Sequence, residues 1–252
     1  MIVAIDKSTE LILNNKHIQF QIFDYLHYSK KYKDQRFDDD SVGLDIVSHC
    51  LENDRTWEPF QTEITTEILK EDKDGLFIDV GCHLGYYSTL ASLIGTQTVS
   101  IDSCVSFLTL FNKTIKNNNL TNIKIVKETV DEFFNLVEHI PSNVNINLIK
   151  IDIEGSEKFL INSIDSLLAE NKIKNIIMEI SPKLDKNYDI LCRKLHSYGY
   201  NVYDIGLSHQ RQLQQNTNHL QDIDKLMINI DNITEYIQNI QYGQSNFLFR
   251  KS

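Results

Sequence analysis

The sequence has few glycines and prolines, no paired cysteines and no long apolar segment. Nine glycines and three prolines among 252 residues exclude a collagen-like or low-complexity chain. No C-x-x-C pair is present, which excludes a zinc ribbon or a thioredoxin motif, and scattered thiols are typical of a reducing compartment. These thiols are Cys50, Cys82, Cys104 and Cys192. The apolar runs are too short for a helix that spans a bilayer.

Basic residues are also in the minority. Lysine and arginine number 25 against 35 aspartates and glutamates, a formal charge of −10, so a large nucleic-acid footprint is not expected, although a local basic groove is not excluded. The first ten residues carry Asp6, Lys7 and Glu10 and lack the basic start and apolar core of a secretory signal. We therefore expect a soluble cytoplasmic protein without a nucleic-acid or membrane partner.

Residues 1–70 differ in pattern from the rest of the chain. Ile18, Phe20 and Ile22 alternate with polar residues, which predicts a strand, and Asn14-Asn15 before it predicts a hairpin turn. Residues 42–51 and 64–69 have helical spacing, and residues 28–40 are charged enough to form a solvated loop. We expect a small N-terminal hairpin and helical extension over residues 1–70, attached to a larger domain over residues 71–252.

From Leu76 onward, short apolar runs alternate with helical patterns, which predicts βαβ units and a parallel sheet covered by helices on both faces. The predicted strands are residues 76–80, 98–101, 123–127, 146–152, 175–180, 201–205 and 246–250. The predicted helices are residues 86–94, 107–118, 131–139, 156–170 and 188–198, with a short one that starts at Asn232-Ile233-Thr234-Glu235. The polar segment 208–222 is expected to be a lid or binding loop.

The segment FIDVGCHLGYY, residues 77–87, reads as a strand, a turn with Gly81 and Gly85, and a helix. Asp79 ends this strand, and Asp102 lies 21 residues after Gly81 at the end of the next one, where an acidic residue binds ribose hydroxyls in nucleotide-binding sheets. The spacing is neither the G-x-G-x-x-G of dinucleotide enzymes nor a P-loop. A nucleoside without phosphates, such as S-adenosylmethionine, fits this pattern. The alternative is an ordinary strand–turn–helix joint.

The segment LIKIDIEGSE, residues 148–157, places Lys150 inside a central strand, where a lysine needs a partner. Glu154, Glu157 and Glu179 are the candidate partners. Asp152, Glu154 and Glu179 are expected to meet Asp79 at one sheet edge, where clustered carboxylates raise one another's pKa and suit a general base. The alternatives are an ion-pair network that only closes the strand ends, or a divalent metal site, which is less favoured because Lys150 already supplies positive charge.

Taken together, these motifs resemble the FkbM family of S-adenosylmethionine-dependent methyltransferases. The resemblance rests on FIDVGCHLGYYSTLA, NNLTNI, LIKIDIEGSE and IIMEISP, and it covers about residues 50–205 plus NFLFR near the end. It implies an α/β, Rossmann-like class I methyltransferase fold, with a mostly parallel seven-stranded sheet whose last strand is reversed. It also implies O-methylation of a small molecule, often at a sugar hydroxyl.

Carried over by position, the resemblance implies that Asp79, Gly81 and Gly85 line the methionine end of the cofactor and that Asp102 holds the ribose. The chain departs from the family pattern at Cys82-His83 and at Asp102-Ser103. Together with the adenine side and the upstream segment, the expected cofactor residues are Glu58, Asp79, Gly81, His83, Gly85, Asp102, Ser103, Glu128, Thr129 and Asp152.

The expected reaction is direct displacement, with Asp152 or Glu154 as general base and with Lys150 and Glu179 completing the catalytic group. The partner is a small-molecule or glycan acceptor, with a nucleotide sugar among the options, and the chain is a monomer or a homodimer. Rival interpretations are an RNA ribose 2′-O-methyltransferase, a nucleotide-sugar oxidoreductase of Rossmann type and a non-catalytic module that binds S-adenosylmethionine. Trp57 either stacks on a sugar or anchors the core.

Overall fold

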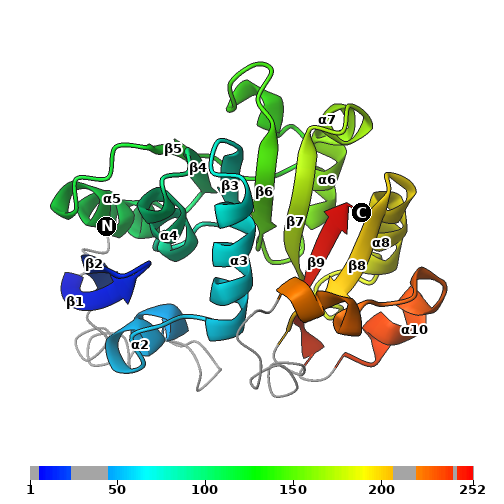
Figure 1. The fold of residues 1–252 in the computed structure, drawn as a ribbon, viewed down its shortest axis with the longest axis horizontal. Helices are drawn as coiled ribbons and strands as arrows, with labels where there is room; N and C mark the ends of the chain where they lie inside the picture. Colours follow the sequence, from blue (N-terminus) through cyan, green and yellow to red (C-terminus); the bar gives the residue numbers. More distant parts are fainter. Residues whose placement is uncertain (1–5, 24–44, 207–219, 241–242, 252) are drawn as a thin grey trace, which may run out of the picture.

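The computed structural model describes residues 6–23, 45–206, 220–240 and 243–251, and its main feature is a seven-stranded sheet (Figure 1). The strand order is β5-β4-β3-β6-β7-β9-β8. The strands are β3 (Leu76–Val80), β4 (Thr98–Asp102), β5 (Ile123–Lys127), β6 (Ile146–Ile151), β7 (Ile173–Ile180), β8 (Tyr200–Asp204) and β9 (Ser245–Lys251).

All neighbouring strands are parallel except β9, which runs antiparallel to both β7 and β8. The chain builds outward from β3 through β4 to β5, then returns to β6 on the other side of β3. Strand order therefore reverses between β3 and β6, and open α/β sheets bind ligands beyond the carboxyl ends of the strands at such a point. The mostly parallel sheet and its reversed last strand are confirmed.

Helices cover both faces of the sheet, as the continuous apolar strands predict. One face carries α3 (Pro59–Glu71), α4 (Tyr86–Ile94) and α5 (Val105–Asn117), with α2 (Ile46–Asn53) further out. The other face carries α6 (Glu157–Ser163), α7 (Asp165–Ala169), α8 (Tyr188–Ser197) and α10 (Ile233–Gln238). Short 3-10 helices occupy Leu136–Glu138, Leu220–Leu226 and Ile230–Asn232.

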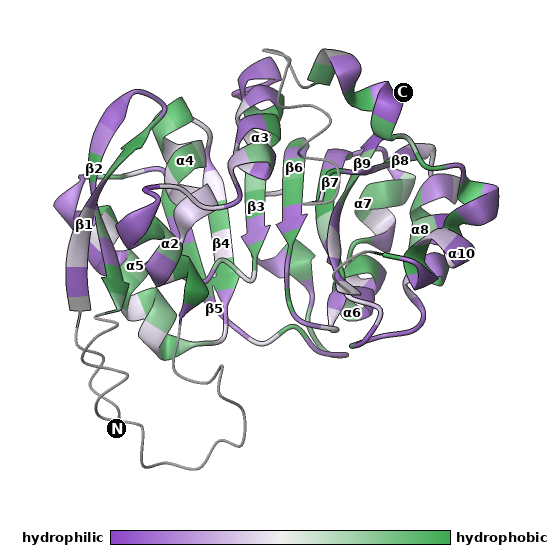
Figure 2. Ribbon diagram, turned by 90° about the horizontal axis from the view of Figure 1, so that it is seen from below, coloured by the Kyte–Doolittle hydropathy of each residue, from purple (hydrophilic) through white to green (hydrophobic). Residues whose placement is uncertain are grey.

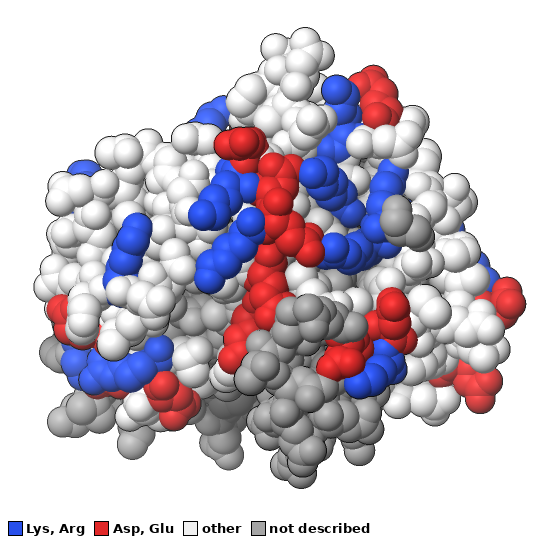
Figure 3. Space-filling model, viewed as in Figure 1, with Lys and Arg blue, Asp and Glu red and all other residues white. Residues whose placement is uncertain are grey.

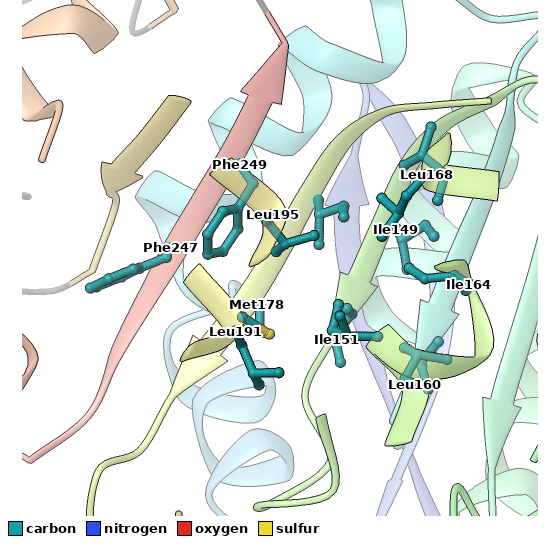
Figure 4. Close-up of a cluster of buried hydrophobic side chains, with 14 of the residues drawn as sticks. Ile149, Ile151, Leu160, Ile164, Leu168, Met178, Leu191, Leu195, Phe247 and Phe249 are labelled. Atoms are coloured by element: carbon teal, nitrogen blue, oxygen red, sulfur yellow. The ribbon is translucent and has the colours of Figure 1, made fainter. Parts of the chain in front are cut away.

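Alternation along the strands divides the core into two layers. Phe77 and Leu148 pack on the side of α3 and α4, whereas their neighbours Ile78 and Ile149 pack on the side of α6 to α8. Figure 2 shows β6 and β7 largely in the hydrophobic colour. In Figure 4, side chains of β6, β7 and β9 meet those of α6, α7 and α8, for example Ile151 with Leu160.

The predicted hairpin is present as β1 (Asp6–Leu13) and β2 (Lys16–Phe23), a two-stranded unit outside the main sheet. Asn14 and Asn15 form its turn with φ of 47° and 61°, the left-handed values that a tight hairpin turn needs. β2 packs on α5, where the Gln21 amide donates to Thr114 Oγ1 at 3.0 Å. Phe20 is fully buried in the same cluster as Phe77 of β3, so the hairpin shares a core with the sheet.

Two predicted helices are wrong in their extent. Residues 131–139 contain only the 3-10 turn Leu136–Glu138, because Asp131 Oδ1 accepts the Phe133 amide and Asn135 Oδ1 accepts the Val137 amide. Such local side-chain bonds compete with an α-helix. The predicted helix 156–170 is split into α6 and α7 at Ile164, next to Ser163, whose hydroxyl donates to the Leu160 carbonyl.

Most other boundaries agree within about two residues, but α3 starts five residues before the predicted Ile64, and α2 starts four residues after the predicted Val42. α10 starts at Ile233 as predicted, but Asn232 makes no capping bond with its side chain. α2 starts at Ile46, and its cap is Asp45, which accepts the Ser48 amide. The predicted loop 28–40 and the residues 208–219 of the predicted lid, with His209 and His219, lie outside the described residues. None of the described helices is both long and apolar enough to span a bilayer.

The outward face of α3 carries a row of acidic residues, which forms the red column in the centre of Figure 3. Glu63, Glu67 and Glu71 are spaced four apart and so share this face. Arg250 of β9 donates to both carboxylate oxygens of Glu71 at 3.0 Å. This pair ties the end of α3 to the sheet beneath it.

Gly85 is a position where a side chain has no room. A Cβ there would lie 2.2 Å from the ring of Phe111, and φ is +78°. Gly95 also has a positive φ, of +106°, but nothing lies within 4 Å of a Cβ. We expect Gly95→Ala to cost about 1–2 kcal/mol of unfolding free energy from backbone strain alone. Gly85→Ala should cost about 1–3 kcal/mol more through overpacking.

Urea unfolding of both variants measures these costs. Equal destabilisation of the two variants would show that α5 yields to the added methyl group.

Candidate active site

A pocket of about 630 Å³ opens at the carboxyl ends of β3, β4, β5, β6 and β7. Its volume is within the usual range of about 300–1,000 Å³ for small-ligand sites. Most of the predicted site residues line it: Asp79, Gly81, His83, Asp102, Ser103, Glu128, Thr129, Lys150, Asp152, Glu154 and Glu179. Glu58 and Gly85 do not line it.

The two glycines of the first motif have different surroundings. A Cβ on Gly81 would lie 1.8 Å from the Asp152 carbonyl oxygen, so only glycine lets the ends of β3 and β6 approach this closely. The Gly81 amide also donates to the Ile101 carbonyl at 2.9 Å. Gly85 instead makes room for Phe111, as described above. Gly81 therefore belongs to the pocket wall, and Gly85 supports the loop from behind.

Asp102 holds the loop that follows β3. Its Oδ2 accepts the His83 amide and its Oδ1 accepts the Cys104 amide, both at 2.8 Å. Each carboxylate oxygen has a further lone pair for a ligand hydroxyl. Asp102 lies on the pocket wall, where the sequence motif predicts a ribose contact.

His83 adopts a left-handed conformation with φ of 52°. Its Nε2 lies 3.3 Å from Asp45 Oδ1, and its ring centroid lies 3.8 Å from that of Phe107. Burial lowers the pKa of His83, partly offset by Asp45, which favours the neutral ring near pH 7. His83 connects the loop after β3 to α2.

Asp79 is a buried carboxyl group with an unused oxygen. It is 1% exposed, and its Oδ2 accepts the Ser88 hydroxyl at 2.6 Å. Its Oδ1 has no hydrogen-bond partner among the described residues, although Asp79 lines the pocket. Burial raises the pKa of Asp79. A buried acceptor without a donor costs folding free energy. We therefore expect a bound molecule to donate a hydrogen bond to Asp79 Oδ1.

Lys150 is 4% exposed and carries its charge into the pocket wall. Its Nζ lies 3.0 Å from Asp152 Oδ2 and 5.1 Å from the centroid of the Tyr87 ring. Burial lowers the pKa of Lys150, but the carboxylates of Asp152, Asp79 and Glu58 outweigh this effect and raise it above the usual value. The amine therefore stays protonated.

The predicted partners of Lys150 need correction. In the described residues its ion pair is with Asp152, which directly follows the end of β6, and not with Glu154, Glu157 or Glu179. Glu157 instead closes the turn after β6. Its Oε1 accepts the Ile153 and Gly155 amides at 3.3 Å, and its Oε2 accepts the Tyr188 hydroxyl at 2.9 Å.

Asp152, Glu154 and Glu179 bring one carboxylate oxygen each to within 4.8 Å of the others. Burial, then Asp152 and Glu154, raise the pKa of Glu179 to about 7. Ser181 Oγ donates to its Oε1 at 2.9 Å and Gln244 Nε2 to its Oε2 at 3.3 Å. This oxygen set could hold a divalent cation. Equally, Glu179 has the pKa of a general base that works near neutrality.

Glu58 lies behind the pocket wall rather than on it. Its Oε2 accepts the Tyr87 hydroxyl at 2.8 Å and Gln61 Nε2 at 2.9 Å, and its Oε1 accepts Asn246 Nδ2 at 2.9 Å. The carboxylate therefore already has protein donors on both oxygens. The Glu58 carboxylate contacts the pocket wall through its hydrogen bond with Tyr87, which is a lining residue.

The aromatic residues were only partly predicted. Tyr86 and Tyr87 are each 3% exposed, and both belong to the core and line the pocket. Trp57 is partly buried, packs against the core and lines the pocket. Cys82 is buried, which raises the pKa of its thiol far above the usual value and keeps it protonated.

Several lining residues escaped the sequence analysis. Asp45, Ile46 and Val47 come from the start of α2, Phe107 from α5, and Gln244 from the segment before β9. Asp45 had a detectable signal, since aspartate is a preferred residue at a helix N-cap. The others reach the pocket through long-range packing, which leaves no local pattern.

The strand order, with its reversed strand β9, defines a Rossmann-like fold that solved methyltransferase structures share. The METTL16 methyltransferase domain is similar, with a TM-score of 0.52 and 13% identity over 91% of this chain and 92% of that one. A T. thermophilus 16S rRNA N2 G1207 methyltransferase, RsmC, in complex with AdoMet and guanosine has a TM-score of 0.50 and 9% identity, over 98% of this chain and 51% of that one. At these identities the likeness shows the fold alone.

The family follows from the sequence itself. The model of the methyltransferase FkbM domain matches residues 62–202, more than half of the chain. The protein therefore belongs to the FkbM methyltransferase family. No curated protein matches the chain.

Lys150 should be essential to stability because of the carboxylates around it. Lys150→Met leaves buried negative charges unpaired and should cost about 3–5 kcal/mol of unfolding free energy at pH 7. The exposed pair of Lys174 with Asp72 offers a matched control, and Lys174→Met should cost about 0–1 kcal/mol.

The pH dependence has a definite sign. Without Lys150, the buried carboxyl groups have higher pKa values in the folded state than in the unfolded state. The unfolding free energy of Lys150→Met therefore falls as pH rises above the unfolded pKa values near 4. The difference in unfolding free energy between the wild type and Lys150→Met should shrink as pH is lowered from 7 toward 4.5. A difference that is constant with pH in denaturant unfolding would contradict this account.

Proposed function

We propose that the protein is an S-adenosylmethionine-dependent O-methyltransferase that acts on a hydroxyl of a sugar or glycan-type acceptor. Family membership supports methyl transfer as the class of reaction. The observation that carries the O-methylation proposal is Glu179, a carboxyl group with a pKa of about 7 in the pocket, held by Ser181 and Gln244. Such a group can take the proton of a hydroxyl as the methyl group is transferred.

The residues present fit this cofactor. Its ammonium group is a donor of the kind that Asp79 Oδ1 lacks, and its ribose hydroxyls suit the free lone pairs of Asp102. Glu128 and Thr129, at the next strand end, line the pocket where the adenine would lie. When bound, the cofactor supplies an electrophilic methyl group on a sulfonium. The acidic lining favours that positive charge.

The chain's own residues would position the acceptor and remove its proton. The acceptor oxygen must lie in line with the methyl group and the sulfonium. This alignment contributes the larger part of the rate acceleration. Of the carboxylates that the sequence favours as the base, Asp152 is paired with Lys150 at 3.0 Å. We therefore assign the base to Glu179, with Asp152 and Glu154 as the neighbours that raise its pKa.

Cofactor binding tests the first part of the proposal. Calorimetry should show heat with S-adenosylmethionine and S-adenosylhomocysteine. Asp102→Asn removes a charge-assisted acceptor worth about 1.5–3 kcal/mol, so binding should weaken about 10–100-fold. Asp165→Asn, on α7 and outside the pocket, should leave the affinity unchanged. If the wild type gives no heat with either compound, the assignment of S-adenosylmethionine as the cofactor is wrong.

The base assignment predicts a specific pH profile. With an acceptor identified from a panel of sugars and glycans, the turnover rate should rise with pH through a midpoint near 7, as Glu179 loses its proton. Glu179→Gln should lower turnover about 10²–10⁴-fold while cofactor affinity holds. Glu154→Gln should move the midpoint downward, because one of the charges that raise the Glu179 pKa is gone.

Two outcomes would contradict the assignment. The first is that Glu179→Gln keeps full turnover while Asp152→Asn or Glu154→Gln lowers it. The general base would then be Asp152 or Glu154, whichever substitution lowers turnover. Turnover that disappears with a chelator and returns with a divalent cation would assign the three carboxylates to a metal instead.

A further inference from the structure

The pocket wall is strongly acidic. Seven of its lining residues are aspartate or glutamate, and Lys150 is the single lysine or arginine among the described lining residues. His83 adds little positive charge, because burial lowers its pKa. A molecule that enters this pocket therefore meets an excess of negative charge.

The charges are not balanced evenly along the pocket. Asp152 is paired with the charged Lys150 at 3.0 Å, whereas Asp45 and Glu128 have histidine partners, His83 at 3.3 Å and His139 at 3.0 Å. Glu154 and Glu179 have no lysine or arginine within ion-pair distance among the described residues. Both lie at the end of the pocket that the proposed reaction assigns to the acceptor.

Nearby lysines do not cancel this charge. Lys183 is exposed and does not line the pocket, and Lys158 is paired with Asp185 at 3.6 Å. Glu154 and Glu179 therefore favour an acceptor whose reacting end is uncharged or brings positive charge.

We propose that Glu154 and Glu179 select the acceptor by charge: the site takes hydroxyl compounds whose reacting end is uncharged or carries an ammonium group, and it rejects those with a phosphate or carboxylate there. This rests on the proposed function. It narrows the acceptor away from nucleotide sugars and toward neutral or amino sugars. Like charges in a partly desolvated pocket repel strongly enough to give specificity without any steric barrier.

The test compares matched acceptors on the same sugar scaffolds. Gluco-, galacto- and manno-configured methyl glycosides are assayed with their 2-amino, uronic acid and 6-phosphate counterparts, with S-adenosylmethionine as donor. We expect kcat/KM of the neutral and amino forms to exceed that of the anionic forms about tenfold or more. Raising the salt concentration should narrow this ratio, because Glu154 is exposed to solvent and screened.

Glu154→Gln separates charge selection from catalysis. It removes one negative charge from the acceptor end, so the ratio of neutral to anionic kcat/KM should fall about threefold or more even if the overall rate changes. Asp165→Asn removes one charge of the same sign from the remote helix α7 and should leave the ratio unchanged. An unchanged ratio in Glu154→Gln would overturn the role of that residue.

The remaining outcomes distinguish this inference from the function on which it rests. Methylation of the anionic forms at equal or higher kcat/KM would overturn charge selection and leave the O-methyltransferase assignment intact. Bound S-adenosylmethionine without methylation of any sugar in the panel would overturn both.

Discussion

The buried ammonium group of Lys150 is the interaction on which the rest of the site depends. Helices cover both faces of the sheet, so a lysine on the central strand β6 is stable only among negative charges. Asp152, Asp79 and Glu58 supply them and keep the amine protonated. One cation cannot neutralise every acid at this edge. Burial, and then the nearby charges of Asp152 and Glu154, raise the pKa of Glu179 to about 7. Stability and the proposed acid–base chemistry therefore have the same electrostatic origin.

Close backbone contact builds the floor of the pocket. Gly81 lets the end of β3 touch the Asp152 carbonyl, and Asp102 holds the intervening loop through two amides. Phe111 of α5 fills the space behind Gly85. Other parts of the pocket wall are built differently, from side chains at the start of α2, Trp57 and Gln244, which come from segments far apart in the chain.

Local patterns predicted those parts of the structure that depend on local forces. The strand 123–127 was predicted to the residue, since an apolar run between polar turns has few other conformations. The helix predicted over 131–139 failed because Asp131 and Asn135 bond to their own backbone. The partner of Lys150 was also wrong, because glutamates that follow a strand can point in several directions and Glu157 turns toward Tyr188. Glu58 matched the family motif but binds Tyr87 instead of lining the pocket.

The sequence alone determined the βαβ order, the reversed last strand through its family resemblance, and the set of acids at the strand ends, because residue type and strand period decide these locally. Only the tertiary structure decided which acids share the Lys150 charge, which of them keep a free oxygen, and which distant segments close the pocket. Those outcomes depend on side-chain directions and on burial, and both arise only when elements remote in the chain pack together.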